Sequence, residues 1–321
     1  MAASAEGRVL WEPGSALVDS CRLTDYARWL GRGKGVETTA YQPLWEWSVS
    51  DLGRFWASLL EYFEVAQPPR SEGRLPRREM PFARWFPKTK LNYAQQALGL
   101  LLPEREVVVA YSEGGRRQSL TGSQLVGQVG SLAAQLADLG VRPGDRVAAY
   151  LPNVPEAVVA CLATASLGAV WSSCSPDFGE AAVLDRLAQI EPVVLVVADG
   201  YRYGGRAFDR RQVTEYIAKA LPSVRHVVTL GVLDTGAAPW LAGAMAWQDL
   251  VSDLRNPTFR PVAFDHPLWI LYSSGTTGPP KPIVHGHGGM VLEHLKALAL
   301  HADIGPSSRF FWFTTTGWMM W

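Results

Sequence analysis

Ten consecutive residues late in the chain combine hydroxyl groups, glycines and a lysine in a way that suits a polyphosphate. Tyr272–Lys281 reads Tyr-Ser-Ser-Gly-Thr-Thr-Gly-Pro-Pro-Lys and directly follows the apolar run Trp269–Leu271. Glycines let the backbone approach a ligand, N–H and hydroxyl groups donate to phosphate oxygens, and lysine supplies positive charge. The candidate phosphate-binding residues are therefore Ser273, Ser274, Gly275, Thr276, Thr277, Gly278 and Lys281.

The spacing of this loop disfavours two better-known nucleotide-binding loops. A Walker A loop has four residues between its glycines and Ser or Thr after its lysine, whereas two residues separate Gly275 from Gly278 and Pro282 follows Lys281. Its prolines also oppose a helix start, which disfavours a phosphate site at a helix N-terminus. No further glycine completes a dinucleotide fingerprint after Gly286–Gly288. A polar hairpin loop without a ligand remains the alternative, because these residue types are common in turns.

Other reactive side chains do not assemble into a second site. His285 and His287 alternate without a nearby cysteine or a third ligand, so we predict a structural role for them and no metal site. Cys21, Cys161 and Cys174 are too widely spaced for a disulfide framework or a metal-ligand motif, which indicates a reducing, intracellular location. The absence of a Gly-x-Ser-x-Gly elbow argues against a serine hydrolase.

Composition narrows the class of protein further. The 321 residues suggest one large or two ordinary domains, and 30 Lys+Arg balance 30 Asp+Glu. A net charge of zero argues against a nucleic-acid partner and against a polybasic membrane patch. Residues 1–20 lack the pattern of a signal peptide, and the apolar stretch 154–171 is interpreted as a buried helix and strand, so no membrane span is expected.

The elements that must position the loop alternate along the chain. Apolar runs predict strands at 106–112, 146–151, 169–173, 193–198, 226–230, 268–273 and 310–315. Helical periodicity predicts helices at 24–31, 50–63, 92–102, about 125–139, 154–166, from an Asp177 cap to 190, 210–221 and 289–301. Strands that alternate with helices predict an α/β fold, with parallel-rich sheets flanked by helices.

The pattern of strands and helices predicts two regions in the chain and a second domain that is not complete at its C-terminal end. Residues 1–105 are irregular, helical and rich in tryptophan, whereas residues 106–321 carry the α/β pattern. The chain ends on the apolar run Gly317–Trp321 just after an expected strand. Because termini usually lie at the surface, we expect a truncated domain.

Tyr272–Lys281 resembles the signature loop of the superfamily of acyl-CoA synthetases, peptide-synthetase adenylation domains and luciferases. Further blocks resemble that superfamily at Ser119–Leu125, Leu139–Ala148, Pro152–Glu156 and Arg309–Trp318. Gly122 and Gln124 stand where the family has Tyr and Glu. The resemblance implies the N-terminal part of the large domain of an adenylate-forming enzyme, truncated before the C-terminal lid domain. It also implies that the loop holds the phosphates of ATP together with Mg²⁺.

Within this superfamily the N-terminal third is similar to acetoacetyl-CoA synthetases. The similar segments are Leu10–Pro13, Trp47–Val49, Phe55–Trp56 and Trp85–Ala94. The resemblance implies that Trp318, Met319 and Met320 form the acyl pocket, with methionines where acetyl-specific relatives carry Val-Thr; ordinary core packing is the alternative. Lys88 and Lys90 depart from the small residues of the family in a segment that approaches CoA. They either pair with CoA phosphates or form a solvated turn.

The resemblance implies a cytosolic acid–thiol ligase of ketone-body and fatty-acid metabolism, which converts acetoacetate, ATP and CoA into acetoacetyl-CoA, AMP and pyrophosphate. An acetyl- or propionyl-CoA synthetase is one alternative, and a non-catalytic nucleotide-binding protein is another. The catalytic lysine and the metal-binding glutamate of the family are expected beyond residue 321. We therefore expect this chain alone to be inactive in adenylation.

Overall fold

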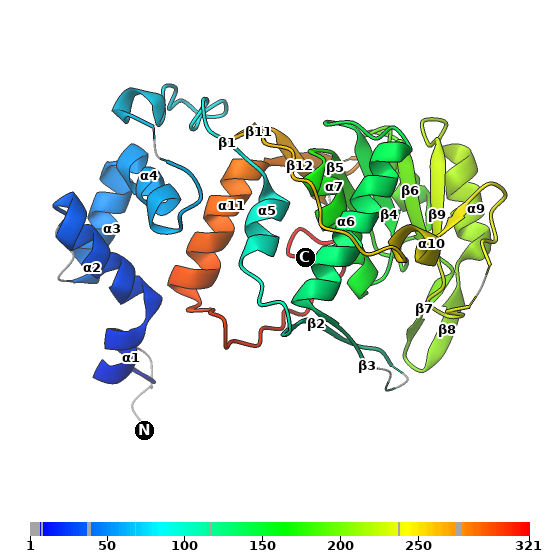
Figure 1. Cartoon of the computed structure of the whole chain (residues 1–321), viewed down its shortest axis with the longest axis horizontal. Coiled ribbons are helices and arrows are strands. Elements are labelled where there is room, and N and C mark those ends of the chain that lie inside the picture. The colour runs from blue at the N-terminus through cyan, green and yellow to red at the C-terminus, as the bar shows by residue number, and fades with distance from the viewer. Residues whose placement is uncertain are drawn as a thin grey trace, which may run out of the picture. The chain divides into compact units, whose positions relative to one another are not determined.

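The computed structural model describes residues 7, 9–36, 40–67, 69–113, 115, 117–236, 238–273 and 278–321. The chain divides into two compact units (Figure 1). The helical unit comprises Met1–Phe86 and Leu292–Phe310, and the sheet unit comprises Pro87–Val291 and Phe311–Trp321. Among the described residues, no helix is long and apolar enough to cross a membrane.

The helical unit packs short helices around aromatic side chains. Its helices are α1 (Ser15–Ser20), α2 (Arg22–Lys34), α3 (Tyr41–Ser50), α4 (Leu52–Tyr62), the 3₁₀ turn η1 (Ser71–Gly73) and the π-helical η2 (Lys296–His301). Tyr26 of α2 is buried, and its hydroxyl lies 2.6 Å from that of Ser58 on α4. Helices α2 and α4 confirm two sequence predictions. Helix α3 was not predicted, because its Pro43 reads as a helix breaker although the first turn tolerates proline.

The sheet unit is built on a seven-stranded sheet, and this confirms the α/β prediction. Its order is β10 (Met245–Ala246), β9 (His226–Leu230), β6 (Val194–Ala198), β4 (Arg146–Tyr150), β5 (Val170–Cys174), β12 (Pro267–Ser273) and β13 (Lys281–Gly286). Every neighbouring pair is parallel except β12 with β13. Because β5 lies on one side of β4 and β6 on the other, the strand order reverses at β4.

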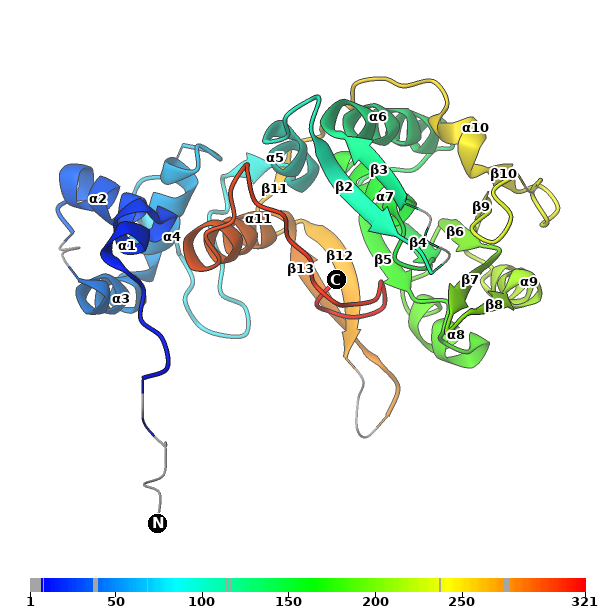
Figure 2. The ribbon, with the colours of Figure 1, turned by 90° about the horizontal axis from the view of Figure 1, so that it is seen from below.

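Helices cover both faces of this sheet, as the predicted βαβ units require. Alternate residues of β4 face opposite sides, so Val147 belongs to one apolar cluster and Ala148 to the other. The first cluster contains residues of α5 (Tyr93–Gly99), α6 (Gly122–Asp138), α7 (Pro155–Ser166) and α10 (Trp247–Val251). The second contains residues of α8 (Glu180–Leu187) and α9 (Arg211–Ala220). Figure 2 shows the two helix layers on either side of the strands.

The predicted helix at 289–301 is confirmed, as α11 (His287–Leu295) continued by the π-helical η2. Two other sequence predictions need correction. The segment 310–315 forms no strand in the described structure, and Phe311 and Phe313 are exposed. Helix α8 starts after Gly179, so Asp177 is not its N-cap.

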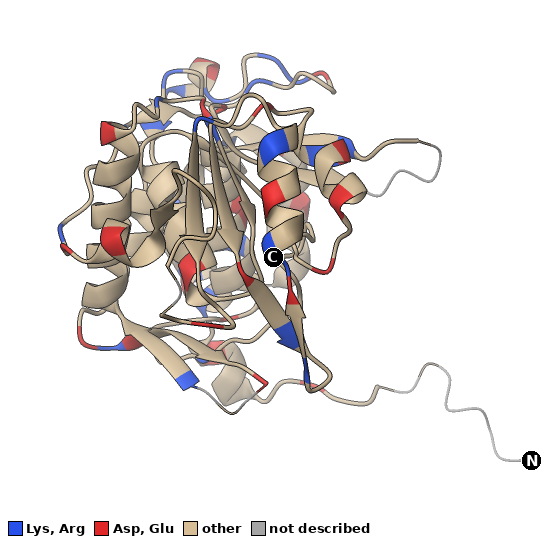
Figure 3. Cartoon of the chain, turned by 90° about the vertical axis from the view of Figure 1, so that its right-hand side faces the viewer, with Lys and Arg blue, Asp and Glu red and all other residues tan. Residues whose placement is uncertain are grey.

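Positive and negative residues are interspersed along the ribbon, in keeping with the zero net charge (Figure 3).

Asn92 ties together three segments of the sheet unit. Its buried side-chain amide donates to the carbonyls of Ala165, Ser166 and Arg260 at 2.9, 3.1 and 2.9 Å. Its side-chain oxygen also accepts from two N–H groups in the first turn of α5 and so caps that helix. One residue therefore fixes the entry to α5, the end of α7 and the segment before β11 (Val262–Ala263).

We predict that Asn92→Ala lowers the free energy of unfolding by about 3 kcal/mol, because it removes a cap and leaves buried carbonyls unpaired. Asn92→Asp keeps the capping oxygen but replaces the donors, so it should destabilise the protein at least as much. Urea denaturation followed by far-UV circular dichroism measures both. Wild-type stability of either variant would contradict this role.

His287 is buried beside a second histidine. Its Nδ1 accepts the backbone N–H of Tyr93 at 3.1 Å, and the ring of His266 lies 5.8 Å away. Burial, reinforced by His266, lowers the pKa of His287 from 6.5 to about 4. The folded protein therefore holds this imidazole neutral at pH values where the unfolded chain protonates it.

It follows that stability should be fully present above about pH 6.5 and fall as the pH drops towards 4, with a loss of about 2 kcal/mol at pH 5 from this group. His287→Gln cannot take up the proton and should show a shallower loss. Urea denaturation at pH 7.5 and pH 5 compares the two proteins. Identical pH dependence in both would exclude His287 as the source.

Candidate functional site

The candidate phosphate-binding residues lie in the segment that connects β12 to β13, the two strands of a β-hairpin. Ser273 at the end of β12 pairs with Lys281 at the start of β13, and the ladder continues to Gly286. Lys281 and Gly278 are exposed and Ser273 is half-buried, whereas Ser274–Thr277 lie outside the described residues. A strand rather than a helix follows Lys281, as the prolines predicted, so this loop does not have the architecture of a Walker A loop.

Strand β12 brings this hairpin to the carboxyl edge of the parallel sheet. Trp269 of β12 is in register with Trp171 of β5, and the Ser172 hydroxyl donates to the Ile270 carbonyl at 2.8 Å. The two strands run in the same direction, so Ser273 ends at the same edge as β5. Open α/β sheets bind ligands at this edge.

The end of the chain lies at the same edge. The Thr316 hydroxyl donates to the carbonyl of Leu151, just after β4, and the Thr316 carbonyl accepts from the Ser173 hydroxyl of β5; both distances are 2.6 Å. Within this chain, Trp318, Met319 and Met320 of the same segment are 51%, 42% and 59% exposed. Strand β12, which ends at Ser273, pairs with β5, and Ser173 of β5 holds Thr316, so the start of the hairpin and Thr316 are attached to neighbouring strands.

Arg186 of α8 connects the two parts of this edge. Its guanidinium lies 4.9 Å from the ring centre of Phe178 and 5.9 Å from that of Tyr272. The Tyr272 hydroxyl also donates to the Arg186 carbonyl at 2.7 Å. A Cβ added to Gly317 would come within 3.2 Å of Phe178. Tyr272 of β12 thus contacts α8 directly, whereas Gly317 lies beside Phe178 in the loop before α8, and Arg186 contacts both aromatic rings; this connection was not predicted.

An open crevice of 520 Å³ lies further along the same edge. It is lined by the loops after β4 and β9, by the tip of the β2 (Glu106–Tyr111) and β3 (Arg117–Thr121) ribbon, and by Tyr201 and Arg202 of β7 (Gly200–Tyr203). The Glu113 carboxylate accepts the N–H groups of Gly204 and Gly205 at 2.9 Å, and these bonds lower the pKa of Glu113. The crevice has the size of a small-molecule site.

Buried Asp199 holds one wall of this crevice. Its carboxylate accepts N–H groups from Val232, Leu233 and Asp234 at 2.7, 2.9 and 3.0 Å, and Arg211 lies 3.3 Å away. Sequence reasoning missed this residue. The available signal was an acidic side chain placed directly after the apolar run of β6, where parallel strands carry functional groups.

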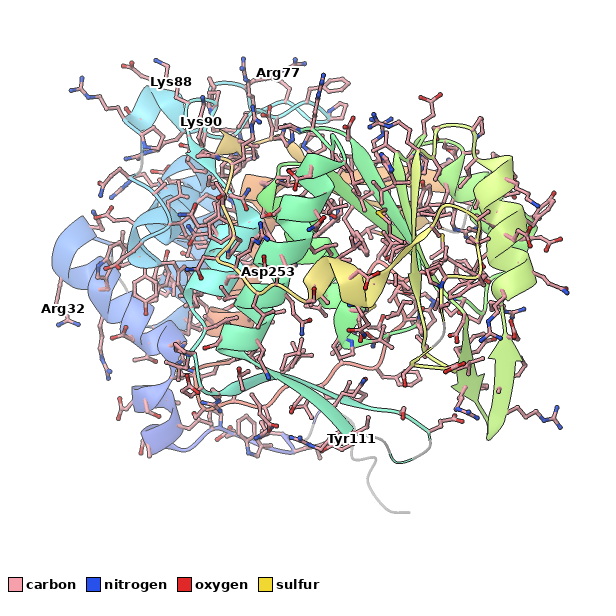
Figure 4. All side chains as sticks on the ribbon, turned by 45° about the vertical axis from the view of Figure 1, so that its right-hand side comes forward. Arg32, Arg77, Lys88, Lys90, Tyr111 and Asp253 are labelled. Carbon is pink, nitrogen blue, oxygen red and sulfur yellow. The ribbon has the colours of Figure 1, made fainter. Side chains whose placement is uncertain are left out.

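The structure does not bring Lys88 and Lys90 to the carboxyl edge. Both side chains are exposed, and Lys90 belongs to β1 (Lys90–Leu91), which pairs with β11. Val262 of β11 packs beside Gly168, at the amino end of β5. Figure 4 accordingly shows the two lysines on the other side of the sheet unit from Tyr111, which lines the crevice.

Protein groups alone do not offer a cation site in the described part of the chain, where no cluster of three His, Cys, Asp or Glu side chains occurs. His285 Nδ1 accepts the indole N–H of Trp269 at 3.0 Å. The hydroxyl- and lysine-bearing hairpin suits Mg²⁺ only as a complex with ATP, since Mg²⁺ prefers phosphate oxygens and water.

Comparison with known proteins agrees with this architecture. The model of the AMP-binding enzyme family matches residues 101–320, and that of the acetyl-coenzyme A synthetase N-terminus matches residues 41–97. The chain is 38% identical over 316 residues to the acetoacetyl-coenzyme A synthetase of Rhizobium meliloti and 34% identical over 337 residues to the acetoacetyl-CoA synthetase of Gallus gallus. Each match covers 98% of this chain, and 48% and 49% of the relative.

A solved structure is similar over the same extent. The acetoacetyl-CoA synthetase from Streptomyces lividans superposes with a TM-score of 0.90 at 46% identity, covering 97% of this chain and 48% of that one. The chain thus spans about half the length of the curated relatives it matches. The hairpin at the carboxyl edge, the α/β sheet and the family model lead to one conclusion: this chain belongs to the AMP-binding enzyme family.

Proposed function

We propose that the protein carrying this chain is an acid–thiol ligase that joins acetoacetate to CoA and converts ATP into AMP and pyrophosphate. The observation that supports the proposal is that β12, which leads into the hairpin, and Thr316, which precedes the Trp318–Met320 segment, are both bound to β5 at the carboxyl edge of the sheet. The similarity to acetoacetyl-CoA synthetases over 98% of the chain supports this choice of substrate.

In the first half-reaction, a carboxylate oxygen of acetoacetate attacks the α-phosphorus of MgATP. A bond forms between that oxygen and phosphorus, the bond to the β-phosphate oxygen breaks, and pyrophosphate leaves. The chain contributes position and charge rather than covalent chemistry. The Lys281 ammonium and the hydroxyls of Ser273, Ser274, Thr276 and Thr277, with the Gly275 and Gly278 backbone, would hold the phosphates.

In the second half-reaction, the CoA sulfur attacks the carbonyl carbon of the acyl-adenylate, the thioester forms, and AMP leaves with the electron pair of the broken C–O bond. Trp318, Met319 and Met320 supply apolar walls for the four-carbon acyl group. Methionine adapts its shape to an irregular ligand. Lys88 and Lys90 are proposed to contact CoA phosphates, which requires the nucleotide end of CoA to lie far from the reacting thiol.

A cytosolic location is part of the proposal. All three cysteines are free thiols, Cys161 and Cys174 are buried, and burial raises the pKa of both to about 12. Thiols that burial keeps protonated and unpaired are in keeping with a reducing compartment.

Lys281→Ala should lower kcat/KM for acetoacetate-dependent exchange of pyrophosphate into ATP by about 100-fold, because it removes one charged donor to the transferred phosphates. Lys219→Ala is the matched control. Lys219 is also exposed and in the sheet unit, and it pairs with Glu215 at 2.6 Å on α9. Equal activities of the two variants would refute the phosphate role of Lys281.

Lys88→Ala/Lys90→Ala is expected to raise the KM for CoA about tenfold and to leave the KM for ATP unchanged, because it removes two charges that face the CoA phosphates. Initial rates of thioester formation at varied CoA concentrations measure this. Arg202→Ala provides the comparison, since Arg202 lines the crevice at the opposite edge. If Arg202→Ala raised the KM for CoA and the double lysine variant did not, the CoA phosphates would be assigned to that crevice instead.

A further inference from the structure

The segment that presents Trp318, Met319 and Met320 is tied to the sheet at both of its ends. We propose that Thr316 is a positioning residue that fixes this segment and thereby sets the preference among carboxylic acids. The inference rests on the proposed function for the identity of the acyl pocket, but the anchoring itself can be tested on its own.

The first tie is Thr316, which is fully buried. Its hydroxyl donates to Leu151 beyond β4, and its carbonyl accepts from Ser173 on β5, both at 2.6 Å. These distances are at the short end for hydrogen bonds between oxygens. Thr316 therefore joins two neighbouring strands at the carboxyl edge through side chain and backbone together.

The second tie is Trp321, whose indole N–H donates to the side-chain oxygen of Asn153 at 3.0 Å. Between the ties the chain makes two successive turns, with the Trp318 N–H donating to Thr315 and the Trp321 N–H to Trp318, both at 3.1 Å. Gly317 passes so close to the β5–α8 loop that an added Cβ would lie 3.2 Å from Phe178. Contacts of Thr316, Gly317 and Trp321 with the rest of the sheet unit thus hold these turns.

Within this chain, Trp318, Met319 and Met320 all keep at least 42% of their surface exposed. The contacts that this chain itself supplies to hold the backbone of the segment are the hydrogen bonds of Thr316 and Trp321. Acids that differ by one carbonyl or methylene group are distinguished by how closely the pocket walls fit. A loosened wall should therefore discriminate less.

The test compares hydroxyl deletions at and away from the anchor. Thr316→Val and Ser173→Ala each remove one of the two hydrogen bonds, and Thr316→Ser keeps both. Thr164→Val is the matched control, because Thr164 is equally buried and its hydroxyl donates to the Ala160 carbonyl within α7, away from the anchor. Hydrogen exchange is measured at the Trp318 and Trp321 amides, and initial rates are measured with acetoacetate, acetate, propionate and butyrate.

We expect about tenfold faster exchange of these amides in Thr316→Val and Ser173→Ala, but not in Thr164→Val or Thr316→Ser. The ratio of kcat/KM for acetoacetate to that for butyrate should fall about tenfold in the same two variants.

Unchanged exchange in both Thr316→Val and Ser173→Ala would refute the anchoring role of Thr316, whatever the measured activities are. Faster exchange with an unchanged preference among the acids would refute its role in specificity. The rates are measured on the full-length protein that carries this chain. If that wild-type protein activates none of the four acids, the proposed function and the specificity role are refuted, while the exchange data still test the anchor.

Discussion

The candidate site depends on the parallel pairing of β12 with β5. These strands are separated by more than 90 residues of sequence, yet Trp269 is in register with Trp171 and Ser172 bonds to Ile270. This pairing places the end of β12, and hence the β12–β13 hairpin, beside the strand to which Thr316 is bound. A shift of two residues in this register would move the start of the hairpin by about 7 Å relative to Thr316.

Buried polar side chains fix the loops at both edges of the sheet. Asp199 accepts three N–H groups of the turn after β9, Thr316 joins the ends of β4 and β5, and Asn92 connects three segments at the amino end. Each would be costly to bury without these partners. Loops held in this way suit a reaction in which the protein mainly positions substrates and stabilises charge.

The sequence predicted the parallel strands well because each is a short apolar run bounded by turn residues, as Val193–Ala198 shows. The prediction from sequence failed where the strand propensity of a segment is not matched by pairing with a neighbouring strand. Phe310–Thr315 has strand-forming residues but forms no strand in the described structure. The roles of Thr316 and Asp199 were also missed. Their partners lie at distant positions, 165 residues away for Leu151, and nothing in the local pattern indicates such contacts.

We propose that this edge of the sheet belongs to a ligase that activates acetoacetate as an adenylate. The most direct measurement is mass spectrometry of the nucleotide and thioester products when the full-length protein that carries this chain is supplied with ATP, Mg²⁺, CoA and equal amounts of acetoacetate and acetate. We expect acetoacetyl-CoA in large excess over acetyl-CoA, together with one AMP per thioester. ADP as the nucleotide product, or acetyl-CoA as the main thioester, would contradict this proposal.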